Sequence, residues 1–298
     1  MRYSQFLPIL YKELNDKNSD VGVNELAGAL SISTDDLLKI PIDYQVVMIE
    51  KRSGGQRKLE IPCRELRTIQ KRVYNLLLRG LSPHPCAMGF LIGKSIVHHA
   101  SKHTAKAVII KIDIKDFFPK TKSPKVEGFF LGIGWNKDAA KILTKLTTYR
   151  GHLPQGAPTS PCLSNLVNSR MDVGLFGIAR KYRAEYSRYA DDITFSLEIY
   201  DRRSVMRIIK KTKYVLKLLG YKLNPKKTRI FKSCQQQLVT GLVVNEKVQI
   251  PRKTRRLLRS IEHRFKQRDH SKLPTMNRSQ LKGWKSFEQM IQNQAVDP

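Results

Sequence analysis

Tyr189-Ala190-Asp191-Asp192 is the stretch of this sequence that decides its fold, because it places two adjacent carboxylates between two runs with strand character. Residues 185–188 and 193–196 alternate polar residues with residues that favour strands, which predicts a β-hairpin with the aspartates at its turn. Two neighbouring carboxylates repel one another, so the arrangement is poor for stability alone. A divalent cation would neutralise both charges, and the stretch therefore predicts a metal site.

A second predicted strand, at residues 107–114, carries Asp113 near its end. Nucleotide transfer uses two divalent ions, which lower the pKa of the attacking hydroxyl and neutralise the charge that builds on the triphosphate. Hard cations prefer carboxylate oxygens, and strand ends hold such ligands rigidly. A lone aspartate at a strand end is more often a turn former, so Asp113 matters only together with Asp191 and Asp192. The three carboxylates predict a site for two Mg²⁺ ions, with Mn²⁺ as an alternative ion.

The charge of the chain is far from balanced. Lysine and arginine number 55 against 25 aspartates and glutamates, which gives a formal net charge of +30 over 298 residues. Such a charge predicts a polyanionic partner, because basic side chains bind phosphates and release condensed counterions. A merely soluble basic protein is the less favoured interpretation.

The cysteines and the apolar runs indicate the compartment. The four cysteines lie far apart without a CxxC pair, so neither structural zinc nor a disulfide framework is expected. The N-terminus has no charged segment followed by an apolar core, and no apolar run approaches the length of a membrane span. We therefore expect a cytoplasmic protein with no membrane partner.

Apolar spacing and turn residues predict the remaining elements. Residues 1–40 are expected to be helical, with Asn24 and Thr34 as candidate helix caps. A helix-turn-helix is less favoured than a packing role there, because Asp35 and Asp36 would face phosphate. The other expected elements are a hairpin at 44–62, a strand at 238–244, and helices at 64–79, 123–150, 202–219 and 252–268.

Six motifs in order resemble those of the reverse transcriptases. A YxDD stretch alone is moderately specific, whereas six motifs in the right order across roughly residues 50–245 are very specific. Residues 57–62 resemble a strand of the fingers, and residues 89–95 resemble the motif after it. Residues 113–118 resemble the first catalytic motif, and residues 153–161 the nucleotide pocket. Residues 189–192 resemble the catalytic signature, and residues 220–228 the motif that follows it.

The resemblance implies an α+β fold of the right-hand polymerase type, with fingers, a palm and a small helical thumb. The antiparallel sheet of the palm would carry the three aspartates. The implied regions are an N-terminal helical region with the fingers at 1–108, the palm at 109–240 with fingers-side helices at about 120–155, and the thumb at 241–298.

The resemblance also implies a role for each matching residue. Asp113, Asp191 and Asp192 would hold the metals, and Lys227, or alternatively Lys226, would give a proton to the departing pyrophosphate. Either lysine could instead be a surface charge that contacts phosphate. Phe118 would be a steric gate against the ribose 2′-OH, or else a core residue. The residues implied to bind the incoming nucleotide are Gln155, Gly156, Tyr189, Arg57 and, at the triphosphate, Lys51 or Arg52.

Two further stretches resemble marks of the retron reverse transcriptases. Val239-Thr240-Gly241 is similar to their VTG signature. Their Asn-Ala-x-x-His segment is matched by His99-Ala100-Ser101-Lys102-His103, in which His99 replaces the Asn. Zinc at the two histidines is not expected, because no third ligand is placed nearby. RNA contact is expected from the side chains of His103, Lys102, Thr240, Arg255, Arg256 and Arg259.

A retron enzyme would be an RNA-directed DNA polymerase that uses deoxynucleotides and a cognate structured non-coding RNA as template. Synthesis would start from a 2′-OH of that RNA and give a branched RNA–DNA hybrid, the msDNA, and a separate effector protein would act with it in anti-phage defence. The alternatives are a reverse transcriptase that is not from a retron, such as a group II intron-like or other defence-associated enzyme, and an RNA-binding scaffold with a polymerase fold.

Overall fold

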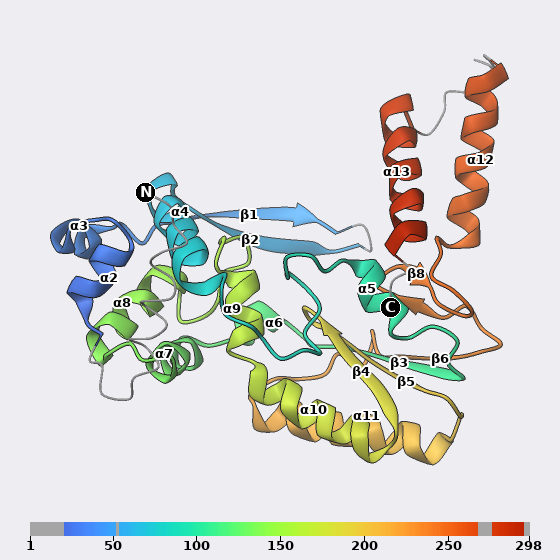
Figure 1. The fold of residues 1–298 in the computed structure, drawn as a ribbon, viewed down its shortest axis with the longest axis horizontal. Coiled ribbons are helices and arrows are strands. Elements are labelled where there is room, and N and C mark those ends of the chain that lie inside the picture. The colour runs from blue at the N-terminus through green and yellow to red at the C-terminus, as the bar shows by residue number, and fades with distance from the viewer. Residues whose placement is uncertain (1–20, 52–53, 268–275, 295–298) are drawn as a thin grey trace. The chain divides into compact units, whose positions relative to one another are not determined.

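The computed structural model describes residues 21–51, 54–267 and 276–294, and its contacts divide the chain into two units (Figure 1). The first unit comprises Met1–Pro85 and Lys115–Val173, and the second comprises Cys86–Ile114 and Gly174–Pro298. Each unit joins two separate segments of the chain, whereas the sequence-based division into three regions is continuous along it and stays a prediction. Half of the helical region expected at residues 1–40 lies outside the described residues.

A four-stranded antiparallel sheet is the centre of the second unit. Its strand order is β4-β5-β3-β6, so β3 is an interior strand, and five of its six residues are buried. The apolar run at residues 107–114 therefore folds as the buried strand that its composition predicts. The strands are β3 (Val108–Asp113), β4 (Ala184–Tyr189), β5 (Asp192–Leu197) and β6 (Arg229–Lys232).

Helix α11 (Arg202–Leu218) and the part of α10 (Ser169–Lys181) from Gly174 onward belong to the same unit as this sheet. In α11 the buried residues repeat at helical spacing, which confirms the amphipathic helix predicted there. Its N-terminus is capped by the carboxylate of Asp201, which accepts from two backbone N–H groups. The two helices approach closely at Gly174, where an added Cβ would lie 3.3 Å from Val215 Cγ1.

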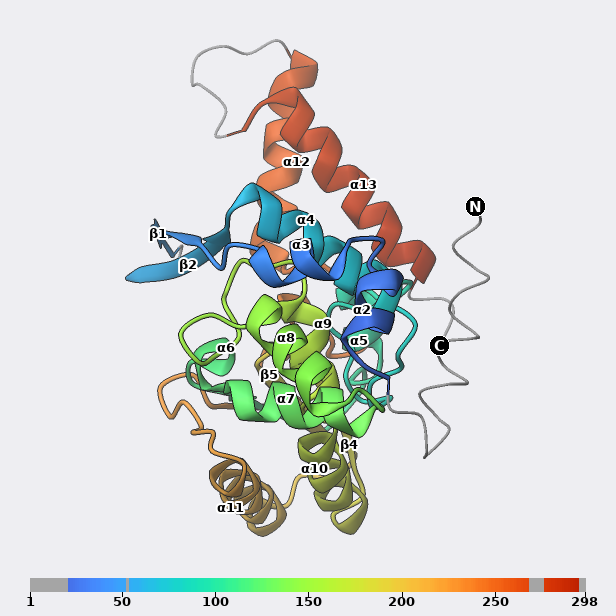
Figure 2. The ribbon, with the colours of Figure 1, turned by 90° about the vertical axis from the view of Figure 1, so that its left-hand side faces the viewer.

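A second, smaller core in this unit joins short strands to helices. The strand predicted at 238–244 is instead a hairpin of β7 (Leu238–Val239) and β8 (Leu242–Val243), because Thr240 and Gly241 between them both adopt positive φ. Buried residues of this hairpin pack with α5 (Ile96–Ser101) and with Ile291. Figures 1 and 2 show α12 (Arg252–Gln267) and α13 (Arg278–Gln294) side by side, and Leu258, Ile261 and Leu281 form the apolar core between them.

The first unit is mostly helical, and Figure 2 shows α7 (Ser123–Gly132) and α8 (Lys137–Thr147) packed together near α2 (Val23–Ala29). The predicted hairpin at 44–62 is present as β1 and β2, whereas the helix predicted at 123–150 is two helices separated at residues 133–136. The elements of this unit are α2 (Val23–Ala29), α3 (Thr34–Lys39), β1 (Tyr44–Glu50), β2 (Gln56–Pro62), α4 (Arg64–Arg72) with a π-helical continuation (Val73–Leu78), α6 (Phe117–Lys120), α7 (Ser123–Gly132), α8 (Lys137–Thr147) and α9 (Ser160–Leu166).

The two predicted caps in this unit are wrong by one or two residues. Ser33, not Thr34, caps α3, since its hydroxyl accepts from the backbone N–H of Asp36 at 3.0 Å. The N-cap of α2 is Gly22, whose N–H donates to the Glu25 carboxylate at 2.9 Å, and Asn24 lies inside the helix. In both cases a neighbouring residue with the same capping chemistry, or an acidic residue in the first turn, satisfies the helix end instead.

Candidate functional site

Three carboxylates converge at one end of the sheet in the second unit. The antiparallel register of β3 and β5 sets Asp113 directly opposite Asp192, and the backbone N–H of Ile114 donates to the Asp191 carbonyl at 3.0 Å. Asp191 occupies the turn between β4 and β5. The structure thus brings together the three residues that the sequence predicted as metal ligands, and it presents them from two neighbouring strands.

The turn that carries Asp191 is stabilised by contacts with neighbouring backbone and with the side chain of Arg188. Ala190 adopts the left-handed conformation, with φ of 56°, and the buried guanidinium of Arg188 donates to its carbonyl at 3.0 Å. Arg188 is also paired through its backbone with Cys86 and Met88, at 2.8 and 2.7 Å. A Cβ on Gly89 would lie 2.9 Å from the Ala190 nitrogen, so only glycine allows this close approach.

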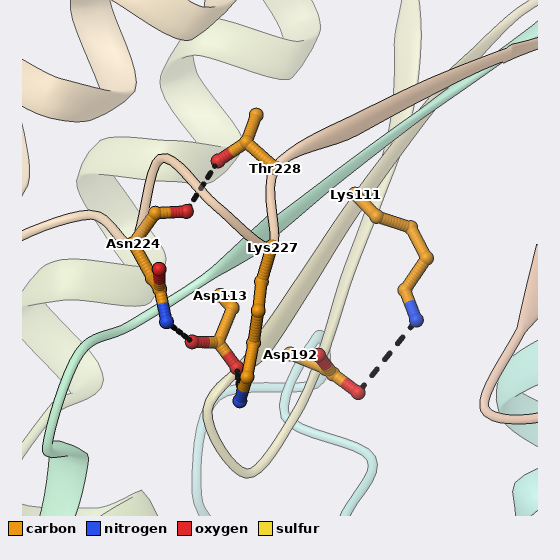
Figure 3. Close-up of polar contacts among 6 residues, drawn as sticks. All are labelled: Lys111, Asp113, Asp192, Asn224, Lys227 and Thr228. Carbon is orange, nitrogen blue, oxygen red and sulfur yellow. Dashed lines mark hydrogen bonds and ion pairs between the residues drawn. The ribbon is translucent and has the colours of Figure 1, made fainter. Parts of the chain in front are cut away.

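The carboxylates differ in their electrostatic partners (Figure 3). Asp113 accepts from Lys227 Nζ at 2.8 Å and from Asn224 Nδ2 at 3.0 Å, while Asp192 lies 3.8 Å from Lys111 Nζ. Burial, and then the charges of Asp192 and Asp113, raise the pKa of Asp191 to about 6. The site therefore holds more negative charge than its protein partners neutralise, which favours a cation beside Asp191.

The donor set fits a hard divalent cation, because it consists of carboxylate oxygens on strand ends with excess negative charge. The side chains as they stand do not form a finished metal cage. Within residues 21–51, 54–267 and 276–294, no three His, Cys, Asp or Glu side chains are arranged to hold a metal ion. Lys227 engages the Asp113 carboxylate, so a cation that used all three aspartates would have to displace this ammonium group.

Lys227 and Lys226, which the sequence left as alternatives, occupy different environments. The backbone N–H groups of Lys227 and Thr228 both donate to the Asn224 carbonyl, at 3.2 and 3.1 Å, and the turn so formed directs Lys227 toward Asp113 (Figure 3). The hydrogen bond to Asp113 raises the pKa of Lys227. Lys226 is exposed and has no contact with the aspartates in the described part of the chain. The geometry thus distinguishes Lys227 as the lysine beside the carboxylates.

Apart from Tyr189, the residues expected to bind the nucleotide belong to the first unit, where a loop is attached to β2. The Glu60 N–H donates to the Gln155 carbonyl at 2.9 Å, and a Cβ on Gly156 would lie 2.8 Å from the Glu60 carbonyl oxygen. Gly156 has φ of 138°, a value that side-chain-bearing residues rarely adopt. The carboxylate of Glu60 is buried and pairs with Lys58 and His152, at 2.8 and 3.0 Å. These contacts fix Gln155 and Gly156 beside the strand that carries Arg57.

The other nucleotide-binding candidates of this unit are placed less specifically. Arg57 and Lys51 are exposed near the end of the β1–β2 hairpin, and Arg52 lies outside the described residues. Phe118, in α6, is partly buried against the core of the first unit and has its ring 5.7 Å from that of Phe117. Its partial burial is compatible with either interpretation, so the steric gate stays a prediction.

His103 corrects one prediction, because its side chain is fully buried and cannot contact RNA. Its Nδ1 lies 2.7 Å from Ser196 Oγ and its Nε2 lies 2.6 Å from Ser187 Oγ, so the imidazole links β5 to β4 beneath the aspartate turn. Both ring nitrogens are engaged, and burial lowers the pKa of His103 well below its usual range. A sequence cannot reveal this role, since the two serines are far from His103 along the chain.

His99 is equally buried but differs in its partners. Neither of its ring nitrogens has a hydrogen-bond partner among the described residues, and burial lowers its pKa to about 3. Its ring lies 5.7 Å from that of His103 and 5.6 Å from that of Tyr189. Tyr189, expected to bind substrate, is half-buried and directly precedes the turn.

The remaining RNA-binding candidates are spread over the second unit. Lys102 is exposed and lies 3.8 Å from Glu185. Thr240 is partly buried, with its hydroxyl donating to the Ile96 carbonyl at 3.3 Å. Arg256 and Arg259 are exposed on α12, whereas Arg255 is partly buried. Their contacts with RNA stay predictions.

A family model and several characterised proteins match this chain. The model described as reverse transcriptase (RNA-dependent DNA polymerase) matches residues 49–255, more than two thirds of the chain. The Retron Ec86 reverse transcriptase of Escherichia coli is 35% identical over 269 residues, which cover 88% of this chain and 81% of that protein. The Retron Mx65 reverse transcriptase of Myxococcus xanthus is 35% identical over 266 residues, which cover 83% of this chain and 61% of that protein.

Solved structures give the same fold. The apo telomerase of Candida tropicalis, truncated from its C-terminal domain, aligns with a TM-score of 0.51 and 13% identity over 70% of this chain and 55% of that one. The telomerase of Candida albicans with a fragment of telomeric RNA aligns with a TM-score of 0.51 and 12% identity over 76% of this chain and 50% of that one. These likenesses confirm the predicted α+β fold of the right-hand polymerase type. Among the described helices, none has the length and apolar character needed to cross a membrane.

Proposed function

Since the chain belongs to the reverse transcriptase family, and to its retron branch, we propose that it makes msDNA as the RNA-directed DNA polymerase of a retron. Membership of the family implies catalysis that depends on divalent metal ions. The observation that carries the proposal is the convergence of Asp113, Asp191 and Asp192 at the end of the β3–β5 pair. Catalysis of this reaction consists mostly of positioning and of stabilising negative charge, and a carboxylate cluster would contribute to both by holding divalent cations.

Asp113, Asp191 and Asp192 would hold two Mg²⁺ ions. These ions would supply activation of the attacking hydroxyl and neutralisation of the triphosphate charge. Lys227, already beside Asp113, would move its ammonium group to the departing pyrophosphate and give it a proton, because a lysine of raised pKa carries that proton at neutral pH. Asn224 would keep Asp113 oriented while Lys227 moves.

The loop of the first unit would bind the incoming deoxynucleotide. Gly156 lies against the backbone of β2 without a side chain, which would leave its open side to the nucleotide, and Gln155 is held by the same strand. Arg57 would pair with the triphosphate, because a guanidinium matches phosphate oxygens in two hydrogen bonds. Phe118 would exclude a ribose 2′-OH.

The template would be a structured non-coding RNA, of which a 2′-OH would serve as the primer. The net charge of +30 supports a large polyanionic partner. The exposed arginines of α12 and Lys102 would contact its phosphates. The branched product and a separate effector protein would act together in anti-phage defence, as the retron branch suggests.

The test of the polymerase compares wild-type protein with the double variant Asp191→Asn, Asp192→Asn on poly(rA) primed with oligo(dT), with dTTP and Mg²⁺. Wild type should incorporate dTMP and the double variant should not. Asp201→Asn is the matched control, because an exposed aspartate that only caps α11 is replaced by another good capping residue. Synthesis by the double variant would contradict the metal assignment, and a wild type inactive on every template would contradict the polymerase proposal.

The test of the retron assignment is the nucleic acid that purifies with the protein. Sequencing should give one RNA covalently joined to DNA through a 2′–5′ linkage. DNA without any such branch, from a protein that polymerises, would place the enzyme outside the retron mode of priming.

A further inference from the structure

A cavity of about 360 Å³ lies in the second unit, at the first turn of α12. Its walls come from three consecutive parts of the chain: the turn at residues 233–236, residues 243–250, and Arg252 with Arg255. The volume is at the lower end of the about 300–1,000 Å³ that is typical of small-ligand sites. The cavity can therefore take one nucleotide-sized group and excludes a double helix.

The basic part of the cavity lining favours an anion. The first N–H groups of any α-helix have no acceptor within the helix, and α12 begins at the cavity wall. Arg252 and Arg255 add two guanidinium groups there. The Nε of Arg255 is buried and has no hydrogen-bond partner among the described residues. Glu246 also lines the cavity and offsets part of this charge, but the helix terminus and two arginines leave a net preference for a phosphate.

The rest of the lining is rich in amides. Gln236 and Gln249 line the cavity, Gln236 as an exposed and Gln249 as a partly buried residue. An amide offers a donor and an acceptor side by side, which is the pattern that pairs with the edge of a nucleic-acid base. The lining thus combines basic groups that suit a phosphate with amides that suit a base, which are the two kinds of contact that a nucleotide needs.

Hydrogen bonds of Asn245 link two parts of the cavity wall. The Asn245 amide donates to the carbonyls of Ser233 and Gln235, at 3.1 and 2.8 Å, and its Oδ1 accepts from the Gln237 N–H at 2.9 Å. These bonds tie the turn at 233–236 to the residues after β8. A site formed before the ligand arrives loses little free energy on ordering, which favours specific binding.

We propose that this cavity binds a single unpaired nucleotide of an RNA strand, with its phosphate at Arg252 and Arg255 and its base against Gln236 and Gln249. Proteins read RNA sequence mainly at unpaired bases, since the bases of an RNA duplex are hard to reach. The site would therefore let the protein recognise one splayed nucleotide in a folded RNA, in addition to the phosphate contacts of the exposed arginines. The inference rests on the proposed function only for the expectation that the ligand belongs to RNA.

The test measures fluorescence anisotropy with two labelled RNAs, a mixed-sequence single strand of about 12 nucleotides that cannot pair and a blunt duplex of the same length. Arg255→Gln is compared with Arg259→Gln, which removes the same charge from an exposed position on the same helix. Arg259→Gln should weaken both RNAs by one common factor. Arg255→Gln should weaken the single strand by a further factor of about 10. Equal losses in the two variants would overturn the proposal.

Gln249→Met tests the base-binding half without any change of charge. It should lower the affinity for the single strand about fivefold and leave the duplex affinity unchanged. It also carries the test if Arg255→Gln fails to fold, which circular dichroism would reveal. An unchanged single-strand affinity in Gln249→Met would refute contact between this amide and a base.

Competition separates the possible sources of the ligand. AMP, GMP, CMP and UMP at millimolar concentration should displace the single strand from wild type more effectively than inorganic phosphate does. Displacement by phosphate and nucleotides alike would overturn base recognition, leaving an anion site only. Synthesis of DNA by wild type on poly(rA) with oligo(dT) is scored separately, so failure of the polymerase proposal and failure of the nucleotide cavity are distinguished.

Discussion

The aspartate turn at residues 189–192 and the glycine loop at residues 152–156 belong to different units, and both hold a backbone conformation that ordinary residues avoid. In the turn the strained residue is Ala190, which has a Cβ, and the neighbouring carboxylates repel one another as well. In the loop the strained residue is Gly156, which has no side chain, and the neighbouring contacts are neutral hydrogen bonds or paired charges.

This difference indicates which property of each region its proposed function depends on. The turn is supported by the hydrogen bond of Arg188 to Ala190 and by the close approach of Gly89, and neither contact uses the carboxylates. We therefore expect the carboxylates to be replaceable without loss of the fold. The loop is held by close backbone contact with β2, so a change at its glycine alters the structure itself. We therefore expect the proposed function of the turn to depend on the charge of its side chains, and that of the loop to depend on its backbone shape.

Asp191→Asn should separate activity from stability most clearly. We expect DNA synthesis to fall by about a thousandfold, because the variant loses one anionic ligand at the reacting centre. In the presence of EDTA the free energy of unfolding should rise by about 1–2 kcal/mol, because a buried carboxylate crowded by two others is replaced by a neutral amide. Incorporation of dTMP and chemical denaturation measure the two effects. A variant that loses activity and stability together would show that the carboxylate supports the turn.

A comparison of Lys227→Gln with Lys226→Gln tests whether the reaction rate depends on a lysine that points at Asp113, or on positive charge anywhere near the site. The two variants make the same change at adjacent residues, but only Lys227 contacts Asp113. A group that transfers a proton contributes roughly 100-fold or more to a rate, so we expect Lys227→Gln to lower the single-turnover rate of nucleotide addition by 10- to 100-fold. Lys226→Gln should change that rate less than about twofold. Equal losses would mean that both lysines act as general phosphate contacts.

Gly156→Ala should be the corresponding change in the loop. The new Cβ would lie 2.8 Å from the Glu60 carbonyl, at a φ of 138° that alanine tolerates poorly. We expect a loss of about 1–3 kcal/mol in the free energy of unfolding and a KM for deoxynucleotide that rises about tenfold, with a smaller change in kcat. Gly220→Ala is the control, since Gly220 has φ of 77° with open space around it. If both variants behave alike, backbone strain alone explains the result and the contact with Glu60 does not matter.

Much of the aspartate turn could be predicted from the sequence, because its parts are local. Strand alternation on both sides of Asp191-Asp192 and the apolar run before Asp113 gave the hairpin and the neighbouring strand, and the register then opposed Asp113 to Asp192. The amphipathic helix α11 followed from its spacing in the same way. Local patterns are visible in a sequence since they involve residues a few positions apart.

What holds these parts could not be predicted, because it depends on contacts between distant segments. The sequence does not show that Arg188 is buried and donates to the turn, nor that Glu60 meets Gly156 across 96 residues of chain. The prediction for His103 failed for this reason. RNA contact was predicted for His103, whereas its side chain is buried and serines on β4 and β5 occupy both of its nitrogens.

The buried histidines His99 and His103 should make the stability of the protein depend on pH, with no change in the chemistry of the aspartates. Burial, together with Lys111 and Lys102, lowers the pKa of His99 to about 3 from an ordinary 6.5. The unfolded chain binds a proton below pH 6.5 that the folded protein excludes, so stability is full above that pH and falls on acidification. From His99 alone we expect the free energy of unfolding to fall by up to about 1.4 kcal/mol per pH unit between pH 6.5 and about 5.

Urea denaturation across this range measures how steeply the free energy of unfolding changes with pH. This slope should be shallower for His99→Asn than for wild type, while His263→Asn, at an exposed position on α12, should keep the wild-type slope. A His99→Asn slope equal to that of wild type would mean that folding does not lower the pKa of His99, which would contradict the link drawn between its burial and the pH dependence.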